Sequence, residues 1–166
     1  GPPADLPLPE WDPRRLAKVE RNYAVAYVRS ILPELCAVLG PADAGFVGRV
    51  AGRQVAMQYH ATITSLLGGD VPDPGHPGDP AAFAQRLARL LRAHGDDVTV
   101  STDGGRAVVR QRTWRLADGL SLPDEGFEAW NGLWEGLAAM EDLRLVVVDR
   151  RDLGDDTFTW EIRPRR

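Results

Sequence analysis

The sequence predicts an α+β domain in which three helices precede a β-β-α-β-β unit. Up to residue 95, apolar residues recur at three- and four-residue steps, which is typical of helices. From Val98 onward, four short segments alternate apolar and polar residues, and turn-forming residues at 103–105 and 152–156 join them in pairs. We therefore expect two hairpins that form one four-stranded antiparallel sheet, with the helices packed on one face.

The first predicted helix begins at Pro13, with Asp12 as its N-cap, and closes at Gly40-Pro41. Pro33 has no amide hydrogen and its ring clashes with an earlier carbonyl, so we expect it to kink or break this helix. The apolar residues fall on one face of the helix: Leu16, Val19, Tyr23, Ala26 and Tyr27.

The second predicted helix runs from Asp43 to about Leu67 and contains several small residues at helical spacing, namely Gly45, Gly48, Ala51 and Gly52. Because glycine costs roughly 0.8–1 kcal/mol at each interior helix position, these glycines indicate close backbone approach to a neighbour or a ligand. The third helix is capped by Asp79 and stops at His94-Gly95.

The first hairpin is expected from Val98–Ser101 and Ala107–Trp114. A polar loop over 116–126 then precedes a fourth amphipathic helix, whose apolar residues are Phe127, Trp130, Leu133, Trp134, Leu137 and Ala138. The last hairpin pairs 143–149 with 157–163. In its final strand the residues Phe158, Trp160 and Ile162 alternate with polar ones, which indicates a sheet with one solvated face.

Composition narrows the class of protein. A chain of 166 residues predicts one domain, which we place at 13–166 behind an extended, proline-rich arm at 1–12. Gly1-Pro2 is typical of the residues that a tag-cleaving protease leaves. A net charge of −4 disfavours nucleic acid as a partner, and no apolar run approaches the length that spans a bilayer. Cys36 is the only cysteine, so an internal disulfide is excluded and a reducing cytoplasm is expected.

His60 is the best candidate for a catalytic group. The chain has no Walker motif, no nucleophile elbow and no clustered histidines, so we expect neither a metal nor a cofactor. His60 lies late in the glycine-rich helix, and an imidazole with an ordinary pKa near 6.5 can act as a general acid or base. The alternative, a hydrogen-bonded structural histidine, stays open.

The predicted binding residues are those that could surround His60 in a hollow between the second helix and the sheet. Arg53 or Arg112 would hold a carboxylate, and the tryptophans would form an aromatic wall for a flat ligand. The full set of substrate-binding candidates is Arg53, Tyr59, Gln58, Tyr27, Arg112, Trp114, Trp130 and Trp134. The alternative for the tryptophans is that they belong to the core.

The pattern of elements over 97–163 carries a family resemblance. With Trp130–Trp134 as the amphipathic helix, and Gly154-Asp155 in the turn of a closing hairpin that leads into Phe158–Trp160, this half resembles the L-2-amino-thiazoline-4-carboxylic acid hydrolase-like family and the related vinyl-reductase-like small-molecule-binding domains. The resemblance implies their fold and a small-molecule pocket. Thr113-Trp114 and Trp134 stand where that family typically has cysteines, so its cysteine or metal chemistry is not expected here.

Three functions follow as hypotheses. The first is a small enzyme, in secondary metabolism, that opens or closes the ring of a compact heterocycle or amino-acid-derived molecule, with His60 moving the proton. The second is a non-catalytic domain of the same fold that binds or senses a small molecule. The third is a partner-binding scaffold, such as a homodimer, whose interface is the glycine-lined helix and exposed aromatic residues.

Overall fold

The structure is a computed structural model that describes residues 4–58, 77–117, 124–151 and 157–165. Within these ranges the order of elements agrees with the predicted one, which confirms the α+β class. The elements are α1 (Pro13–Leu39), α2 (Pro41–Gln58), α4 (Pro80–Ala93), β1 (Val98–Asp103), β2 (Arg106–Gln111), the short 3-10 helix η1 (Arg115–Ala117), α5 (Asp124–Ala139), β3 (Leu143–Arg151) and β4 (Thr157–Pro164).

The four strands form one antiparallel sheet in the order β1-β2-β4-β3. As predicted, Phe158, Trp160 and Ile162 are buried while the residues between them stay partly exposed. The last hairpin thus places β4 inside the sheet and β3 at its edge. The register between β3 and β4 shifts once, between Val147 and Asp149.

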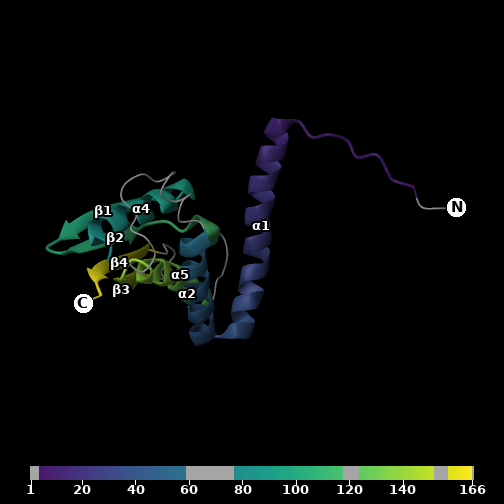
Figure 1. Cartoon of the computed structure of the whole chain (residues 1–166). Helices are drawn as coiled ribbons and strands as arrows, with labels where there is room; N and C mark the ends of the chain where they lie inside the picture. Colours follow the sequence, from purple (N-terminus) through teal and green to yellow (C-terminus); the bar gives the residue numbers. More distant parts are fainter. Residues whose placement is uncertain (1–3, 59–76, 118–123, 152–156, 166) are drawn as a thin grey trace.

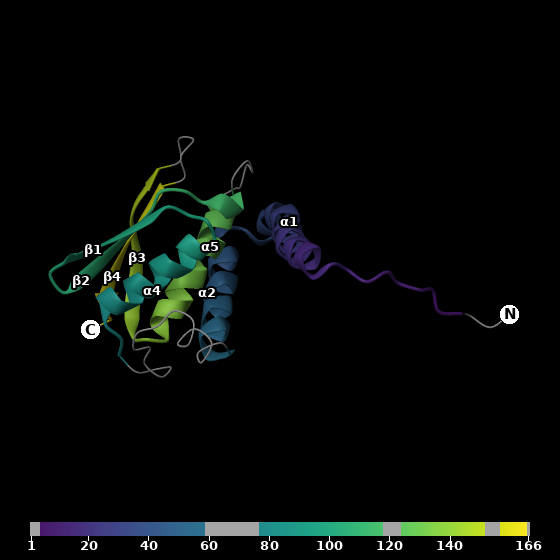
Figure 2. The same cartoon turned by 90° about the horizontal axis from the view of Figure 1, so that it is seen from above.

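The helices form successive layers on one face of the sheet. Helices α4 and α5 cover that face, α2 lies on the outer side of α5, and α1 lies beside this pair and contacts both α5 and α2 (Figures 1 and 2). This arrangement corrects the expectation that the second helix lies over the sheet around a hollow, because α5 is interposed. Residues 4–12 are exposed, without helix or strand, and lead away from the rest of the chain (Figure 1).

Glycines allow α2 and α5 to approach at backbone distance. A Cβ built on Gly52 would lie 2.0 Å from the carbonyl oxygen of Leu133, and one on Gly48 would lie 2.2 Å from that of Ala129. On the facing helix, a Cβ on Gly132 would lie 2.4 Å from the carbonyl oxygen of Gly45. The predicted close approach is therefore confirmed, and its partner is a neighbouring helix.

The helix boundaries follow their caps with one exception. The Asp12 side chain accepts a hydrogen bond from the Arg14 amide at 3.0 Å, and Asp79 accepts one from Ala82 at 3.0 Å. Pro33 does not break α1, which continues to Leu39. Pro33 lies in the half-buried stretch that contacts the rest of the chain, where packing compensates for one missing hydrogen bond. Of the predicted second helix, residues 59–67 lie outside the described residues.

The core between α4, α5 and the sheet is aromatic. Trp114 and Trp130 have ring centroids 5.4 Å apart, Trp130 and Trp134 are 5.1 Å apart, and Phe127 and Phe158 are 4.7 Å apart. All five side chains are buried. Each ring of this size removes about 150–250 Å² from water, so the cluster contributes strongly to the stability of the domain.

Candidate functional site

The structure does not gather the described members of the predicted site around one cavity. Tyr27 lies exposed on α1, Gln58 is the exposed last residue of α2, and Arg112 is exposed just after β2. The three tryptophans pack against one another in the core, as their alternative interpretation held. His60 and Tyr59 lie outside the described residues. Arg53 alone of the described members lines the groove described next.

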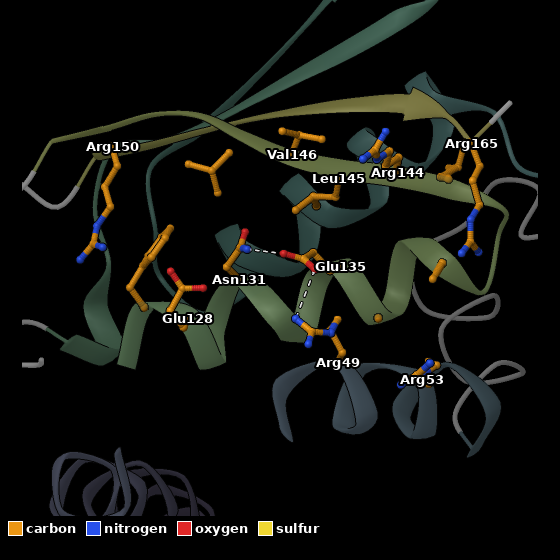
Figure 3. Close-up of a pocket in the computed structure, with 15 residues that line it drawn as sticks. Arg49, Arg53, Glu128, Asn131, Glu135, Arg144, Leu145, Val146, Arg150 and Arg165 are labelled. Carbon is orange, nitrogen blue, oxygen red and sulfur yellow. Dashed lines mark hydrogen bonds and ion pairs between the residues drawn. The ribbon is translucent and has the colours of Figure 1, made fainter. Parts of the chain in front are cut away.

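A groove of about 930 Å³ runs beside the free edge of β3 (Figure 3). Its floor is α5, one wall is the edge strand β3, and α2 closes one end from below. The lining residues are Arg49 and Arg53 of α2; Phe127, Glu128, Asn131, Glu135, Gly136 and Ala139 of α5; Leu143, Arg144, Leu145, Val146, Val147 and Arg150 of β3; and Arg165.

The floor of the groove is one row of side chains along α5. Phe127, Asn131, Glu135 and Ala139 follow one another at four-residue spacing, which places them on the same side of a helix. The row is apolar at both ends and polar in the middle. Phe127 and Asn131 are buried under the sheet, whereas Glu135 and Ala139 stay half-exposed beside β3.

A chain of polar contacts leads from the core into the middle of the groove. The indole Nε1 of Trp160 donates to Asn131 Oδ1 at 3.0 Å, and the Asn131 amide donates to Glu135. Glu135 Oε2 lies 3.7 Å from Nη1 of Arg49. Burial raises the pKa of Glu135, and the nearby Glu128 adds to the effect, while Arg49 and the Asn131 hydrogen bond oppose it.

The groove is cationic in a protein of net charge −4. Its lining contains five arginines against two glutamates. Arg53, Arg144 and Arg165 come from three different segments and lie toward the same end of the groove (Figure 3). At the other end Arg150 lies 3.4 Å from Asp124. The lining therefore favours an anionic ligand.

Sequence reasoning did not find this groove. The spacing of Glu135 does not distinguish it from the other acidic residues, and Asn131, Arg144 and Arg165 belong to no recognisable motif. One available signal was the pair Asn131 and Glu135, polar residues four apart on the apolar side of a helix. Because 19 of the 20 basic residues are arginines, an arginine alone is a weak signal in this chain.

A second feature is the apolar surface of α1. Figure 1 shows this helix running past the end of α2, away from the rest of the chain. We call its exposed apolar residues the α1 face; the most exposed large side chains on it are Tyr23, Val25, Tyr27, Val28, Ile31, Leu35 and Val38. The rings of Tyr23 and Tyr27 lie next to each other, tilted by 49°, with centroids 6.1 Å apart.

The structure also bears on metal binding, on the reactivity of the single thiol and on membrane insertion. Among the described residues, no group of three or more histidine, cysteine, aspartate or glutamate side chains is placed to hold a metal ion. Burial raises the pKa of the Cys36 thiol, and Glu125 adds to it, so this thiol is not activated as a nucleophile. No helix in the described ranges is both long and apolar enough to cross a bilayer. The cytoplasmic location stays a prediction.

Comparison with known proteins adds a shared fold. No family model matches the sequence, and no curated protein matches it. Among solved structures, the chain is similar to a trafficking protein particle complex subunit 3 from Naegleria fowleri that is covalently bound to palmitic acid. The TM-score is 0.63 at 14% identity, over 90% of this chain and 97% of that one. At this identity the likeness shows the fold alone.

The comparison overturns the first functional hypothesis. The chain was expected to be a hydrolase- or cyclase-like enzyme of secondary metabolism, whereas the similar structure is a subunit of a trafficking complex. That interpretation is wrong, and the non-catalytic alternative agrees better with this finding. The resemblance to the thiazoline-carboxylate hydrolase-like and vinyl-reductase-like domains is not tested and stays a prediction.

Proposed function

We propose that this chain is a non-catalytic binding subunit that assembles with a second copy of itself through the α1 face. The observation that carries the proposal is the exposure of large apolar side chains on a helix of 27 residues. Tyr27 is 63% exposed, Ile31 52% and Val38 85%. Soluble monomers rarely leave so large a contiguous apolar surface in water.

The N-terminal half of α1 has almost no support from the rest of the chain. Between Pro13 and Val28, every described side chain except Val19 is exposed, whereas Arg29, Leu32, Pro33 and Cys36 are at least half-buried. Apolar residues therefore face water on more than one side of the helix. Because this half also has Arg, Lys and Glu side chains, a partner would cover its apolar residues and leave the charged ones in water.

The charges on α1 favour an antiparallel pairing of two copies. Two antiparallel copies that cross near Ala26 would place the N-terminal half of each α1 beside the C-terminal half of the other. The same pairing places Arg14 and Arg15 near the C-terminal end of the partner helix, which has a partial negative charge.

The similar solved structure supports an assembling subunit rather than an isolated domain, since it belongs to a subunit of a protein complex. Its palmitic acid is covalently bound in that protein. In this chain the single thiol, Cys36, is 2% exposed and its pKa is raised by burial, which disfavours the thiolate that acylation needs. The proposal therefore rests on the α1 face and not on a bound acyl chain.

Mass measurement in solution tests the proposal with a matched pair of variants. Val28 on the α1 face and Val148 on β3 are almost equally exposed, at 47% and 48%. We expect the wild-type protein to be a dimer by light scattering after size-exclusion chromatography, Val28→Glu to be a monomer, and Val148→Glu to remain a dimer. Circular dichroism should show that both variants fold.

Two results would contradict the proposal. One is a wild-type protein that is monomeric at tens of micromolar while its α1 amides are protected from hydrogen exchange. The other is a dimer that Val28→Glu leaves intact, because a carboxylate buried at the centre of the proposed interface cannot be tolerated.

A further inference from the structure

The edge strand β3 leaves one side of its backbone open. In the sheet order β1-β2-β4-β3, it pairs with β4 on one side, and no strand among the described residues pairs with its other side. Such an edge carries a row of unpaired N–H and C=O groups that can template another strand. The groove described above runs along this edge (Figure 3).

The helix layer continues beyond the edge of the sheet. The row of Phe127, Asn131, Glu135 and Ala139 on α5 lines the groove beside β3. Phe127 and Asn131 are buried against Phe158 and Trp160 of β4, whereas Glu135 and Ala139 stay half-exposed. A strand added about 4.8 Å beyond β3 would therefore face the Glu135 and Ala139 end of this row. The groove thus has the form of a missing strand position, with a hydrogen-bonding edge at its side and a helix beneath it.

The charged residues around the groove indicate that a strand bound there should be acidic. Arg53, Arg144 and Arg165 have no carboxylate partner among the residues that the structure describes, and all three are exposed. Within the groove, Glu135 is occupied by Arg49 and Asn131. An incoming segment with carboxylates near its end would therefore find three guanidinium groups, each able to bind a carboxylate in bidentate fashion.

We propose that the groove binds an extended acidic segment of a partner protein, which adds to β3 as a fifth strand. Its backbone pairs with the open edge of β3, and alternate side chains point down onto the α5 row. A polar side chain of the segment meets Glu135, and an apolar one meets Ala139, because these two residues of the row are half-exposed. Its carboxylates bind Arg53, Arg144 and Arg165. The proposal does not depend on the α1 face.

A fluorescein-labelled heptapeptide, Val-Thr-Ser-Thr-Val-Glu-Glu, is the probe, because in a strand its valines and serine share one face and its two glutamates lie at one end. We expect it to bind the full chain in fluorescence anisotropy, more weakly as salt is raised, and to slow hydrogen exchange of outward-facing β3 amides. The same peptide with lysine in place of glutamate should not bind. Two further versions of the peptide separate strand addition from simple ion pairing: one is N-methylated on the odd-numbered residues and the other on the even-numbered residues. A strand uses the donors on one side only, so one version should bind and the other should not.

Charge-reversal variants locate the binding site. Arg53→Glu combined with Arg165→Glu should weaken peptide binding by at least about tenfold. The matched control is Arg110→Glu combined with Arg112→Glu, two exposed arginines outside the groove with the same total change of charge. This control should bind as the wild-type chain does. Val28→Glu should also keep peptide binding, which separates this proposal from the proposed dimer.

Three outcomes would overturn strand addition. Equal binding of the two N-methylated versions would show that the β3 edge is not used. Equal loss in the groove variant and the control would show only a general effect of charge. Full displacement of the peptide by inorganic phosphate at constant ionic strength, without protection of β3 amides, would assign the groove to small anions instead.

Discussion

From the contact between α2 and α5 we predict opposite effects for glycine-to-alanine substitutions at two positions of α2. In Gly52→Ala, the new methyl group would lie 2.0 Å from the Leu133 carbonyl oxygen and 3.0 Å from the Leu137 nitrogen, all backbone atoms that cannot rotate away. In Gly45→Ala, its nearest neighbour would be the Arg49 guanidinium at 3.3 Å, which is the flexible end of a side chain.

The expected magnitudes follow from these distances. To restore an ordinary contact of 3.4 Å at Gly52, the helices must separate by more than about 1 Å. Such overpacking costs about 1–3 kcal/mol or more, and the better helix propensity of alanine offsets up to about 1 kcal/mol of it. Gly52→Ala should therefore lose about 2 kcal/mol, whereas Gly45→Ala should be neutral or gain up to about 1 kcal/mol.

Urea and thermal denaturation measure both variants against the wild-type chain. A loss of about 2 kcal/mol corresponds to a fall in Tm of roughly 4–8 °C for a domain of this size. If Gly52→Ala and Gly45→Ala change the free energy of unfolding in the same direction by the same amount, the backbone contact between the helices is not as described.

Two further predictions concern buried polar groups. Gln111→Leu should destabilise the fold by about 2 kcal/mol or more in urea denaturation, because it removes the donor to Asp96 and the acceptor for the Trp130 indole; wild-type stability in this variant would refute the role of that network. Burial raises the pKa of Glu135 above its ordinary value of 4.5, so the folded chain keeps this proton to higher pH than the unfolded chain does. The contribution of Glu135 to the free energy of unfolding is therefore greatest below pH 4.5 and falls as the pH rises through the raised pKa. Glu135→Gln should flatten this part of the pH dependence, measured as urea midpoints from pH 4 to 8, while the exposed ion pair that it loses with Arg49 contributes little; identical pH profiles would contradict the assignment.

Local signals predicted the fold well because each is set by neighbours in the sequence. Asp12 and Asp79 cap the helices that they were expected to cap, and the alternation around Trp160 identified the buried face of β4. Pro33 does not end α1, because tertiary contacts at the end of the helix outweigh one lost hydrogen bond. The glycines of α2 showed that something approaches closely, but the partner became visible only with Gly132 and Gly136 of α5 beside them.

The groove was less predictable because it exists only between elements. Its arginines come from α2, β3 and the segment after β4, and no spacing in the sequence relates Arg53 to Arg165. The tryptophans, in contrast, were predicted to line a binding site but belong to the core. Trp114 and Trp134 offered broad aromatic faces for a ligand, yet those faces contact other rings in the core. Aromatic residues report burial, while the identity of what covers them depends on the three-dimensional arrangement.

The hydrogen bond between Trp160 and Asn131 also selects how the strands align. A slip of β4 by one residue would turn Trp160 to the solvated face, which hydrophobicity alone forbids. A slip by two residues keeps every apolar side chain on the correct face, so hydrophobicity tolerates it. It would nevertheless move the Trp160 indole about 6.7 Å along the strand, and the buried amide oxygen of Asn131 would lose its hydrogen-bond donor. This one hydrogen bond therefore disfavours a two-residue register shift that hydrophobic packing alone would allow.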